Sequence, residues 1–314
     1  MNGISASEAV SLFSIETETD LYNLFSRAAA ARNESIGNKV SPCVIINARC
    51  GDCTENCAFC AQSKSASASI QRYPLLSEDE ILRAAENAAS SGAAYFSIVT
   101  SGRAVKPGDE LDRICRVVGR IARELPVKPC ASLGILDEGS LKTLKSAGLV
   151  RYHHNLETAR SYFPSICGTR TYEDQTNTVL FAKNAGLEVC SGGIFGLGES
   201  IEQRVELLET IRELDVDSIP VNFLTPIPGT RLEKMNELTP FDCLKIIAVA
   251  RLMMPSKSIR ICGGREHNLR DFHSWIFFAG ADGVMLGNYL VTAGRNIEKD
   301  LRMISDLQRG LTSL

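Results

Sequence analysis

The sequence predicts an α/β fold, a (β/α)8 TIM-type barrel with an N-terminal helical extension. Two observations predict it: short runs rich in β-branched residues alternate with amphipathic helical stretches, and eight such runs occur along the chain. Strands joined by helical crossovers run parallel, and eight parallel strands can close into a barrel. A doubly wound open sheet is the alternative. No Pro- or Ser-rich linker divides the chain, so we assign residues 1–36 to the extension and residues 37–314 to the barrel.

The elements follow in order along the chain. Residues 5–32 predict two helices that precede the barrel, and the last twenty residues predict a helix that closes it. The predicted strands cover residues 40–47, 93–100, 127–133, 150–155, 187–194, 218–224, 258–262 and 283–286. The helices predicted between them cover residues 77–91, 109–125, 138–147, 172–185, 202–214 and 241–253. Several begin after Ser, Thr or Asp and end near Gly, as helix caps require.

Composition narrows the class of protein. The 314 residues carry a formal net charge of -3, so nothing indicates binding along a nucleic acid or an anionic membrane surface. No run approaches the roughly 18 apolar residues of a membrane span. Residues 1–8 have neither the basic nor the apolar region of a secretory signal. We therefore expect a cytoplasmic protein.

Eleven cysteines are many for such a chain, and four of them crowd into residues 50–60. In a reducing cytosol metal ligation is a more natural use for them than a disulfide framework. Cys53, Cys57 and Cys60 follow the first predicted strand at a spacing that suits three irons of one cubane, which leaves the fourth iron open to a small chelating molecule. The alternative is a zinc knuckle that uses Cys50 as the fourth ligand, but such knuckles have a longer spacer between their two pairs.

This spacing and its place in the chain resemble the signature of the radical S-adenosylmethionine (SAM) superfamily. More specifically, "CTENCAFCAQS" is similar to the cluster loop of the biotin synthase family, with an aromatic residue before the third Cys and Gln-Ser after it. Further similarity runs through residues 35–310 in the segments "YHHNLET", "TRTYED", "VCSGGIFGLGES", "IPVNFL", "PIPGT", "IAVARLMMP" and "IRICGGRE". The resemblance implies a homodimer that inserts sulfur into dethiobiotin. It also implies a [4Fe-4S] cluster on Cys53, Cys57 and Cys60, SAM, and an electron donor such as flavodoxin or ferredoxin.

A second set of cysteines lies on alternate predicted strands. These are Cys43, Cys130, Cys190 and Cys262, on the first, third, fifth and seventh strands. Interior side chains of an eight-stranded barrel stack in layers of four drawn from alternate strands, so four thiols can converge at one point. The alternative is that they are ordinary buried cysteines, as we expect for Cys115, Cys167 and Cys243.

The resemblance also bears on this second set. Common biotin synthases hold an auxiliary [2Fe-2S] cluster with three cysteines and an arginine, and Cys130, Cys190 and Arg260 match three of these positions. The remaining family cysteine falls on Ser97, a poor iron ligand. We therefore expect an auxiliary four-iron cluster held by the four barrel cysteines. Arg260 either ligates it or stabilises its charge, and the sequence leaves both open.

Polar residues that follow the fourth predicted strand form a candidate binding site. His153, Asn155 and Glu157 share one face by the strand period of two. The family pattern is Asn-x-Asn-x-Asp, so Asn155 matches while His153 and Glu157 depart from it. Resemblance assigns Asn155 and Glu157 to SAM, and His153, Asn155 and Asn222 to the ureido ring of the substrate. A satisfied polar side chain inside the barrel is the alternative for His153 and for Asn222.

The remaining cofactor contacts also rest on the resemblance. It places Ile194 and Phe59 against adenine, and Thr100 and Ser101 near the methionyl amino group of SAM. The position of the arginine that binds the SAM carboxylate falls on Gln175, and Arg170 is the alternative for that role.

The chemistry that the resemblance implies is radical sulfur insertion. An electron cleaves SAM to a 5′-deoxyadenosyl radical, which removes hydrogen from dethiobiotin, and the substrate radical takes sulfur from the auxiliary cluster. A second SAM repeats the event at the other carbon and closes the thiophane ring. Because the auxiliary cluster is consumed as the sulfur donor, we expect slow or single-turnover activity without cluster repair. The alternatives are another radical SAM barrel enzyme, such as a mutase or cofactor maturase, and a non-catalytic iron–sulfur carrier.

Overall fold

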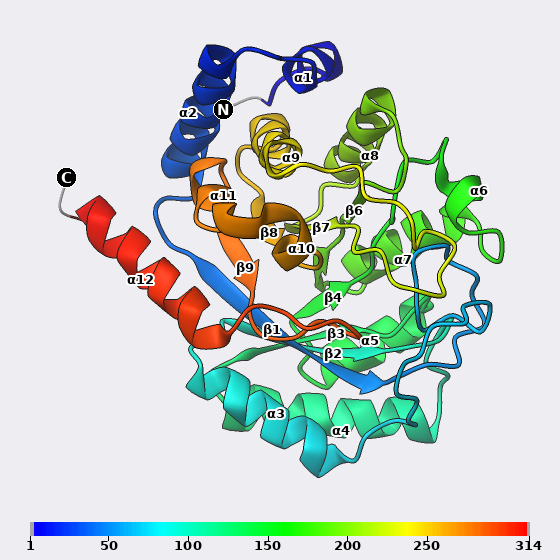
Figure 1. The fold of residues 1–314 in the computed structure, drawn as a ribbon. Helices are drawn as coiled ribbons and strands as arrows, with labels where there is room; N and C mark the ends of the chain where they lie inside the picture. The colour runs from blue at the N-terminus through cyan, green and yellow to red at the C-terminus, as the bar shows by residue number, and fades with distance from the viewer. Residues whose placement is uncertain (1–2, 313–314) are drawn as a thin grey trace.

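Parallel strands close into a ring in the computed structural model, which describes residues 3–312 (Figure 1). The strands are β1 (Ser41–Arg49), β2 (Tyr95–Thr100), β3 (Lys128–Ser132), β4 (Arg151–His153), β5 (Glu188–Cys190), β6 (Gly193–Phe195), β7 (Ser218–Phe223), β8 (Ser258–Ile261) and β9 (Gly283–Met285). Neighbours in the ring follow the order β5-β4-β3-β2-β1-β9-β8-β7-β6, and β5 also pairs with β7. The closed barrel is confirmed, and the open sheet is excluded.

One predicted strand is interrupted. The run over residues 187–194 forms both β5 and β6, so nine short strands fill eight positions in the ring. The interruption falls at Ser191 and Gly192, where a Cβ on Gly192 would lie 2.1 Å from the carbonyl oxygen of Pro220. A Cβ on Gly193 would lie 2.7 Å from the carbonyl oxygen of Glu157. The glycines therefore let this segment approach both of its neighbours closely enough to close the ring.

The predicted helices form close to their expected bounds. They are α3 (Glu78–Ser90), α4 (Asp109–Glu124), α5 (Glu138–Ser146), α7 (Tyr172–Asn184), α8 (Ile201–Glu213), α9 (Pro240–Met253) and, at the C-terminus, α12 (Ile297–Thr312). Capping boxes begin four of them, with Ser77, Thr171, Ser200 and Thr239 as the N-cap residues. Among the described residues, no helix is both long enough and apolar enough to cross a bilayer.

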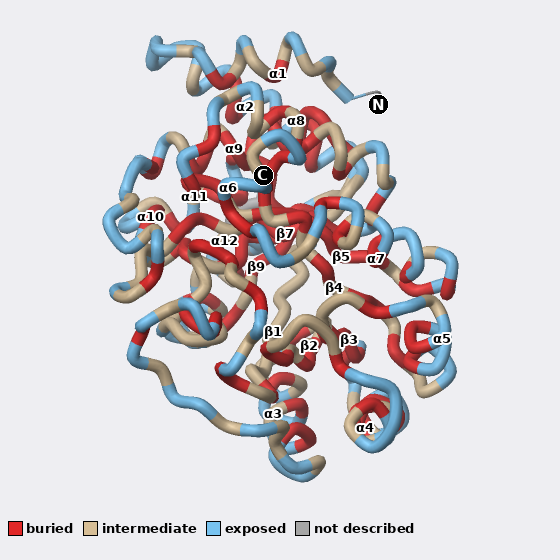
Figure 2. Tube along the Cα trace, turned by 90° about the vertical axis from the view of Figure 1, so that its right-hand side faces the viewer, coloured by how far each residue is buried: buried red, intermediate tan, exposed pale blue. Residues whose placement is uncertain are grey.

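The two N-terminal helices, α1 (Ala6–Phe13) and α2 (Glu18–Ser35), pack on the outer layer of the barrel. There α1 contacts α8 and α9, and α2 contacts α9. Short elements that the sequence pattern did not predict occupy the connections: α6 (Phe163–Ile166), α10 (Arg265–Leu269), η1 (Arg270–Phe272) and α11 (Trp275–Phe278). Buried residues lie on most strands and on the inner helix faces, and exposed residues lie on the outer helix faces (Figure 2). The strand β1, which borders the cavity, is mostly of intermediate burial.

A buried ion pair attaches the C-terminal helix to the barrel. Arg265 donates to both carboxylate oxygens of Asp300, and the side chains of both residues are fully buried. Arg265 also donates to the carbonyl oxygen of Met285 in β9, at 3.1 Å. Burial makes this pair expensive to break, because an unpaired guanidinium would remain in an apolar setting.

We expect Asp300→Asn to lower the free energy of unfolding by about 3 kcal/mol, because it leaves Arg265 charged and buried. Urea denaturation of the two proteins measures the difference. Asp306→Asn, at an exposed position of the same helix, is the control and should change stability by no more than about 0.5 kcal/mol. Equal stability of the two variants would contradict the role of the pair.

Candidate active site

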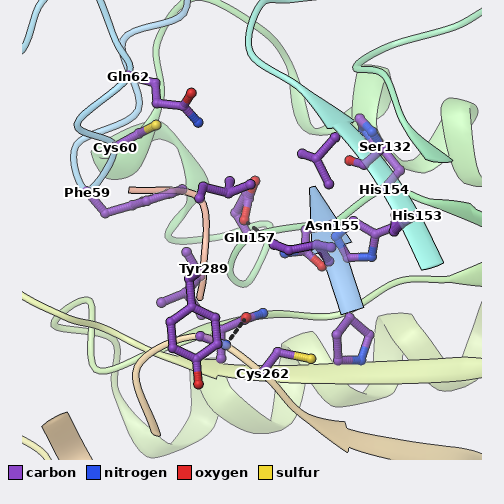
Figure 3. A pocket seen from close by; sticks show the side chains of 18 of the residues that line it. Phe59, Cys60, Gln62, Ser132, His153, His154, Asn155, Glu157, Cys262 and Tyr289 are labelled. Carbon is purple, nitrogen blue, oxygen red and sulfur yellow. Dashed lines mark hydrogen bonds between the residues drawn. The ribbon is translucent and has the colours of Figure 1, made fainter. Parts of the chain in front are cut away.

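One cavity of about 380 Å³ opens inside the barrel, and all sixteen residues that the sequence marked as candidate site residues line it. They are Cys43, Cys53, Cys57, Phe59, Cys60, Thr100, Ser101, Cys130, His153, Asn155, Glu157, Cys190, Ile194, Asn222, Arg260 and Cys262. In Figure 3 the polar residues Asn155 and Glu157 lie between the loop residues Phe59 and Cys60 and the deeper Cys262. The structure thus brings together residues from most of the chain, while their individual roles stay predictions.

The loop that carries the first three thiols is shaped by its own backbone. The amide of Cys53 donates to the carbonyl of Gln62, and the amide of Cys60 donates to the carbonyl of Cys57. Burial raises the pKa of the Cys60 thiol to about 11, so metal binding at this thiol would release a proton at neutral pH. Cys50, which the alternative zinc site requires, is buried and pairs through its backbone with Tyr73. Among the described residues, it is not part of the cavity lining.

The other four thiols lie deeper in the barrel. Cys43 lies on β1, Cys130 on β3 and Cys190 on β5, while Cys262 directly follows β8. With β5 and β6 counted as one position, these are the first, third, fifth and seventh strands of the ring, as predicted. Among the described residues, no group of three or more His, Cys, Asp or Glu side chains is placed to hold a single metal ion. Four thiolates that bind one tetrahedral metal ion lie about 3.8 Å from one another, because each metal–sulfur bond is ~2.3 Å long. Thiolates that bind separate irons of a cluster lie further apart, so a cluster does not require the close spacing of a single-ion site.

Two buried guanidinium groups lie beside these thiols. Arg260 donates from Nε to Ser218 Oγ at 3.1 Å, from Nη1 to the Ser41 carbonyl at 2.7 Å and from Nη2 to Ser41 Oγ at 3.1 Å. Arg151, the second, bonds Glu188 and stacks on the ring of Tyr95, with 3.8 Å from its guanidinium carbon to the ring centroid. Arg151 was not among the residues predicted to form the site, although the strand period places it on the same face as His153.

These arginines act on the acidity of the thiols. Burial raises the pKa of Cys130 and of Cys190, and the positive charges of Arg151 and Arg260 oppose that rise. The pKa of Cys43 falls to about 6, mainly because Cys262 hydrogen-bonds to its sulfur and also because Arg260 is close. These causes favour a thiolate in the Cys43–Cys262 pair and protonated thiols at Cys130 and Cys190.

Unpartnered polar atoms mark where a ligand fits. Thr100 Oγ1, Asn155 Oδ1 and Arg170 Nε are buried without a hydrogen-bond partner, and the three residues line the cavity. Buried polar atoms normally have partners, so this part of the cavity suits a polar ligand. Glu157 contributes a carboxylate held 3.5 Å from Arg170, and burial raises its pKa. Its φ of 71° is a strained conformation for a residue with a Cβ.

Other candidate residues are already engaged with the protein. Gln175 is fully buried, donates to the Asn155 carbonyl at 2.8 Å and lies 3.1 Å from His154 Nε2. Asn222 donates to the Gly193 carbonyl at 3.1 Å and accepts from the amide of Gly263 at 2.9 Å. The Asn222 amide therefore keeps one proton and one lone pair for a ligand. Burial lowers the pKa of His153, which is neutral near pH 7.

The chain matches two protein-family models and is similar to curated proteins over most of its length. Residues 49–211 match the radical SAM superfamily, and residues 220–309 match the biotin and thiamin synthesis associated domain. The chain is 55% identical to a biotin synthase of Pelobacter propionicus over 93% of this chain and 89% of that protein. It is 52% identical to a biotin synthase of Geobacter metallireducens over 97% of this chain and 92% of that protein.

Solved structures share the fold at lower identity. Methylornithine synthase superposes with a TM-score of 0.85 at 23% identity, over 98% of this chain and 93% of that chain. An FeFe-hydrogenase maturase from Carboxydothermus hydrogenoformans superposes with a TM-score of 0.81 at 19% identity, over 97% and 75% of the two chains.

The acidity of the deep thiols gives a test on cluster-free protein. We expect iodoacetamide at pH 7 to modify the Cys43–Cys262 pair roughly tenfold or more faster than Cys130, because the thiolate is the nucleophile. The reaction should slow as the pH falls below about 6, where the pair regains its proton. Peptide mass spectrometry over a pH series measures the rates. Arg260→Met should slow modification of the pair at pH 7, and equal rates at all four thiols would contradict the assignment.

Proposed function

Because the chain belongs to the biotin synthase family of radical SAM enzymes, it is an enzyme that inserts sulfur into dethiobiotin, and we propose that an iron–sulfur cluster inside the barrel donates that sulfur. The observation that carries the proposal is the placement of two sets of thiols along one cavity, three on the loop after β1 and four deeper between the strands. Polar groups suited to an organic ligand lie between the two sets. A carrier protein needs no such enclosed space between two metal centres.

Residues of the loop define the first centre. Cys53, Cys57 and Cys60 would hold three irons of a [4Fe-4S] cluster, which supplies, when bound and reduced, the electron that cleaves SAM to a 5′-deoxyadenosyl radical. The surrounding barrel excludes water and competing hydrogen donors from that reaction. Phe59 and Ile194, which line the cavity, suit the flat face of adenine.

Polar side chains between the centres would hold SAM and dethiobiotin. Arg170 is the group best placed for the SAM carboxylate, because its guanidinium is buried, its Nε has no partner and Gln175 is occupied elsewhere. Thr100 and Ser101 would lie near the methionyl amino group, and Asn155 and Glu157 near the ribose hydroxyls. For the ureido ring we propose His153, Asn155 and Asn222, which offer neutral donors and acceptors.

The deeper centre would be held by Cys43, Cys130, Cys190 and Cys262 as a four-iron auxiliary cluster. Ser97 pairs in register with Cys130 across β2 and β3 and lines the same cavity, but its hydroxyl is a poor iron ligand. We propose that Arg260 stabilises the cluster charge and does not ligate, since all three of its nitrogens bond to Ser41 or Ser218. Arg151 would add a second positive charge on the side of Cys130 and Cys190.

Family resemblance supports three further proposals. We propose a cytoplasmic homodimer that receives its electrons from a flavodoxin or a ferredoxin. Light scattering coupled to size exclusion tests the dimer, and reconstitution with each donor in turn tests the source of electrons.

An anaerobic single-turnover reaction tests the proposed function. Reconstituted protein with dethiobiotin, SAM and a reductant should give biotin and about two 5′-deoxyadenosines per biotin by mass spectrometry. Cys43→Ala and Cys262→Ala should still form 5′-deoxyadenosine but no biotin, and their iron should fall from about eight to about four per chain. Formation of 5′-deoxyadenosine by the wild type without biotin or a thiolated intermediate would refute the role as sulfur donor. Cys243→Ala, which alters a buried cysteine on α9, is the control.

Arg170 gives a separate test on SAM binding. We expect Arg170→Met to weaken SAM binding by roughly 30-fold, because a charge-assisted hydrogen bond worth about 2 kcal/mol is lost. Binding of decarboxylated SAM should change little, since it has no carboxylate to lose. Equilibrium dialysis on cluster-loaded protein compares both ligands, with the exposed Arg116→Met on α4 as the control. Equal losses for both ligands would contradict carboxylate recognition by Arg170.

A further inference from the structure

The segment over residues 166–169, which begins at the last residue of α6, is hydrogen-bonded to the loop that carries Cys53, Cys57 and Cys60. The amide of Ala58 donates to the carbonyl of Ile166 at 2.9 Å. The amide of Asn56 likewise donates to Thr169 Oγ1, at 3.1 Å. In the reverse direction, the amide of Gly168 donates to Asn56 Oδ1 at 2.9 Å. Three hydrogen bonds within four residues on each side hold the two segments in a fixed register.

Charged side chains from other elements reinforce this contact. Thr169 Oγ1 donates to the buried carboxylate of Glu55 at 2.6 Å. Arg103, which follows β2, donates to Glu55 at 3.2 Å and to the Thr169 carbonyl at 3.1 Å. Arg231, which follows β7, donates to the carbonyls of both Asn56 and Ile166. The position of the segment against the loop is therefore fixed from two sides of the barrel.

Cys167 sits in the middle of this contact. Without iron, the Cys57 thiol donates to the Cys167 sulfur at 3.8 Å, and the Cys167 sulfur also lies 3.5 Å from Thr169 Oγ1. Both cysteines are buried, with 2% of Cys167 and 9% of Cys57 exposed, so water does not compete for either sulfur. Cys57 lines the cavity, and Cys167 packs behind it. The sequence predicted a packing role for Cys167, and the structure places its thiol against a proposed cluster ligand.

We propose that Cys167 is a positioning residue whose thiol donates a hydrogen bond to the sulfur of Cys57. The inference rests on the proposed function, in which Cys57 binds an iron of the first cluster. A thiolate that binds iron has no proton, so iron at Cys57 would remove the donor of the bond seen in the structure. Cys167 is then the only one of the two thiols that can donate, and the direction of the bond reverses. The bond draws electron density from the Cys57 sulfur, and hydrogen bonds to cluster sulfurs raise the reduction potential. Cys167 thereby makes the SAM-cleaving centre easier to reduce.

The surrounding contacts make this donor specific. Cys167 leaves the α6 turn with its amide bonded to the Phe163 carbonyl, so its backbone is held on that side as well. Because residues on either side of Cys167 bond to residues on either side of Cys57, the two backbones cannot separate without breaking several hydrogen bonds. A serine at this position would keep an O–H donor in the same place, while an alanine would keep the fold and remove the donor.

The test compares Cys167→Ala and Cys167→Ser with the wild type and with Cys243→Ala, which removes a buried thiol on α9. Redox titration followed by electron paramagnetic resonance measures the midpoint potential of the cluster whose signal shifts when SAM is added. We expect a lower potential in Cys167→Ala, a potential close to the wild type in Cys167→Ser, and no change in Cys243→Ala. An exchangeable proton coupled to the same cluster should be present in the wild type and absent from Cys167→Ala.

The outcomes separate this inference from the proposed function. An unchanged potential in Cys167→Ala, with its full iron content, would overturn the hydrogen bond alone. Equal lowering in the alanine and serine variants would also overturn it, because a structural role for the sulfur would then suffice. If Cys167→Ala takes up no cluster, Cys167→Ser decides the question. A potential close to the wild type together with an altered coupling of the exchangeable proton would support the bond, and an unaltered coupling would overturn it. A wild type that takes up no cluster at all would overturn the proposed function together with this inference.

Discussion

Pairing of β7 with both β5 and β6 is the contact on which the cavity depends, because it joins the two ends of the sheet. In a closed ring alternate side chains of every strand point to a common axis, so segments far apart in sequence deliver their side chains to the same space. The closure requires Gly192 and Gly193, since a side chain at either position would collide with a neighbouring carbonyl. The thiols on β1 and β3 therefore face the thiol on β5 only because β5 and β6 can approach β7.

Charge inside the barrel follows from the same geometry. Four thiols that bind a cluster bring negative charge into a space that water cannot stabilise, and buried charge requires a partner. Arg260 and Arg151 supply that partner from β8 and β4, and each is held in turn by groups near the barrel wall. The ring of Tyr95 interacts with both guanidinium groups, with its centroid 3.8 Å from the guanidinium carbon of Arg151 and 5.0 Å from that of Arg260.

Much of the fold was predictable because strands and helices each leave a periodic pattern in the sequence. The candidate site was predictable where it used recognisable residues, such as the cysteines at fixed spacing and the asparagines near strand ends. The interruption between β5 and β6 was not, because it depends on the distance from Gly192 to Pro220 across the ring. Arg151 was missed although its parity on β4 could have revealed it. Cys167 left no signal, because its contact with Cys57 joins residues 110 positions apart through a turn of irregular structure.

The depth of the four barrel cysteines has a consequence for the order in which substrates bind and products leave. Cys43 lies near the start of β1, whereas the loop with Cys53 follows the end of that strand, so the two proposed centres are stacked along the axis. Under the proposed function, dethiobiotin must settle next to the inner centre before SAM covers it from the outer one. Methionine and deoxyadenosine must then depart before the finished ring can leave. The positions of the two centres along the barrel axis thereby relate the order in which the ligands bind to the order in which the products leave.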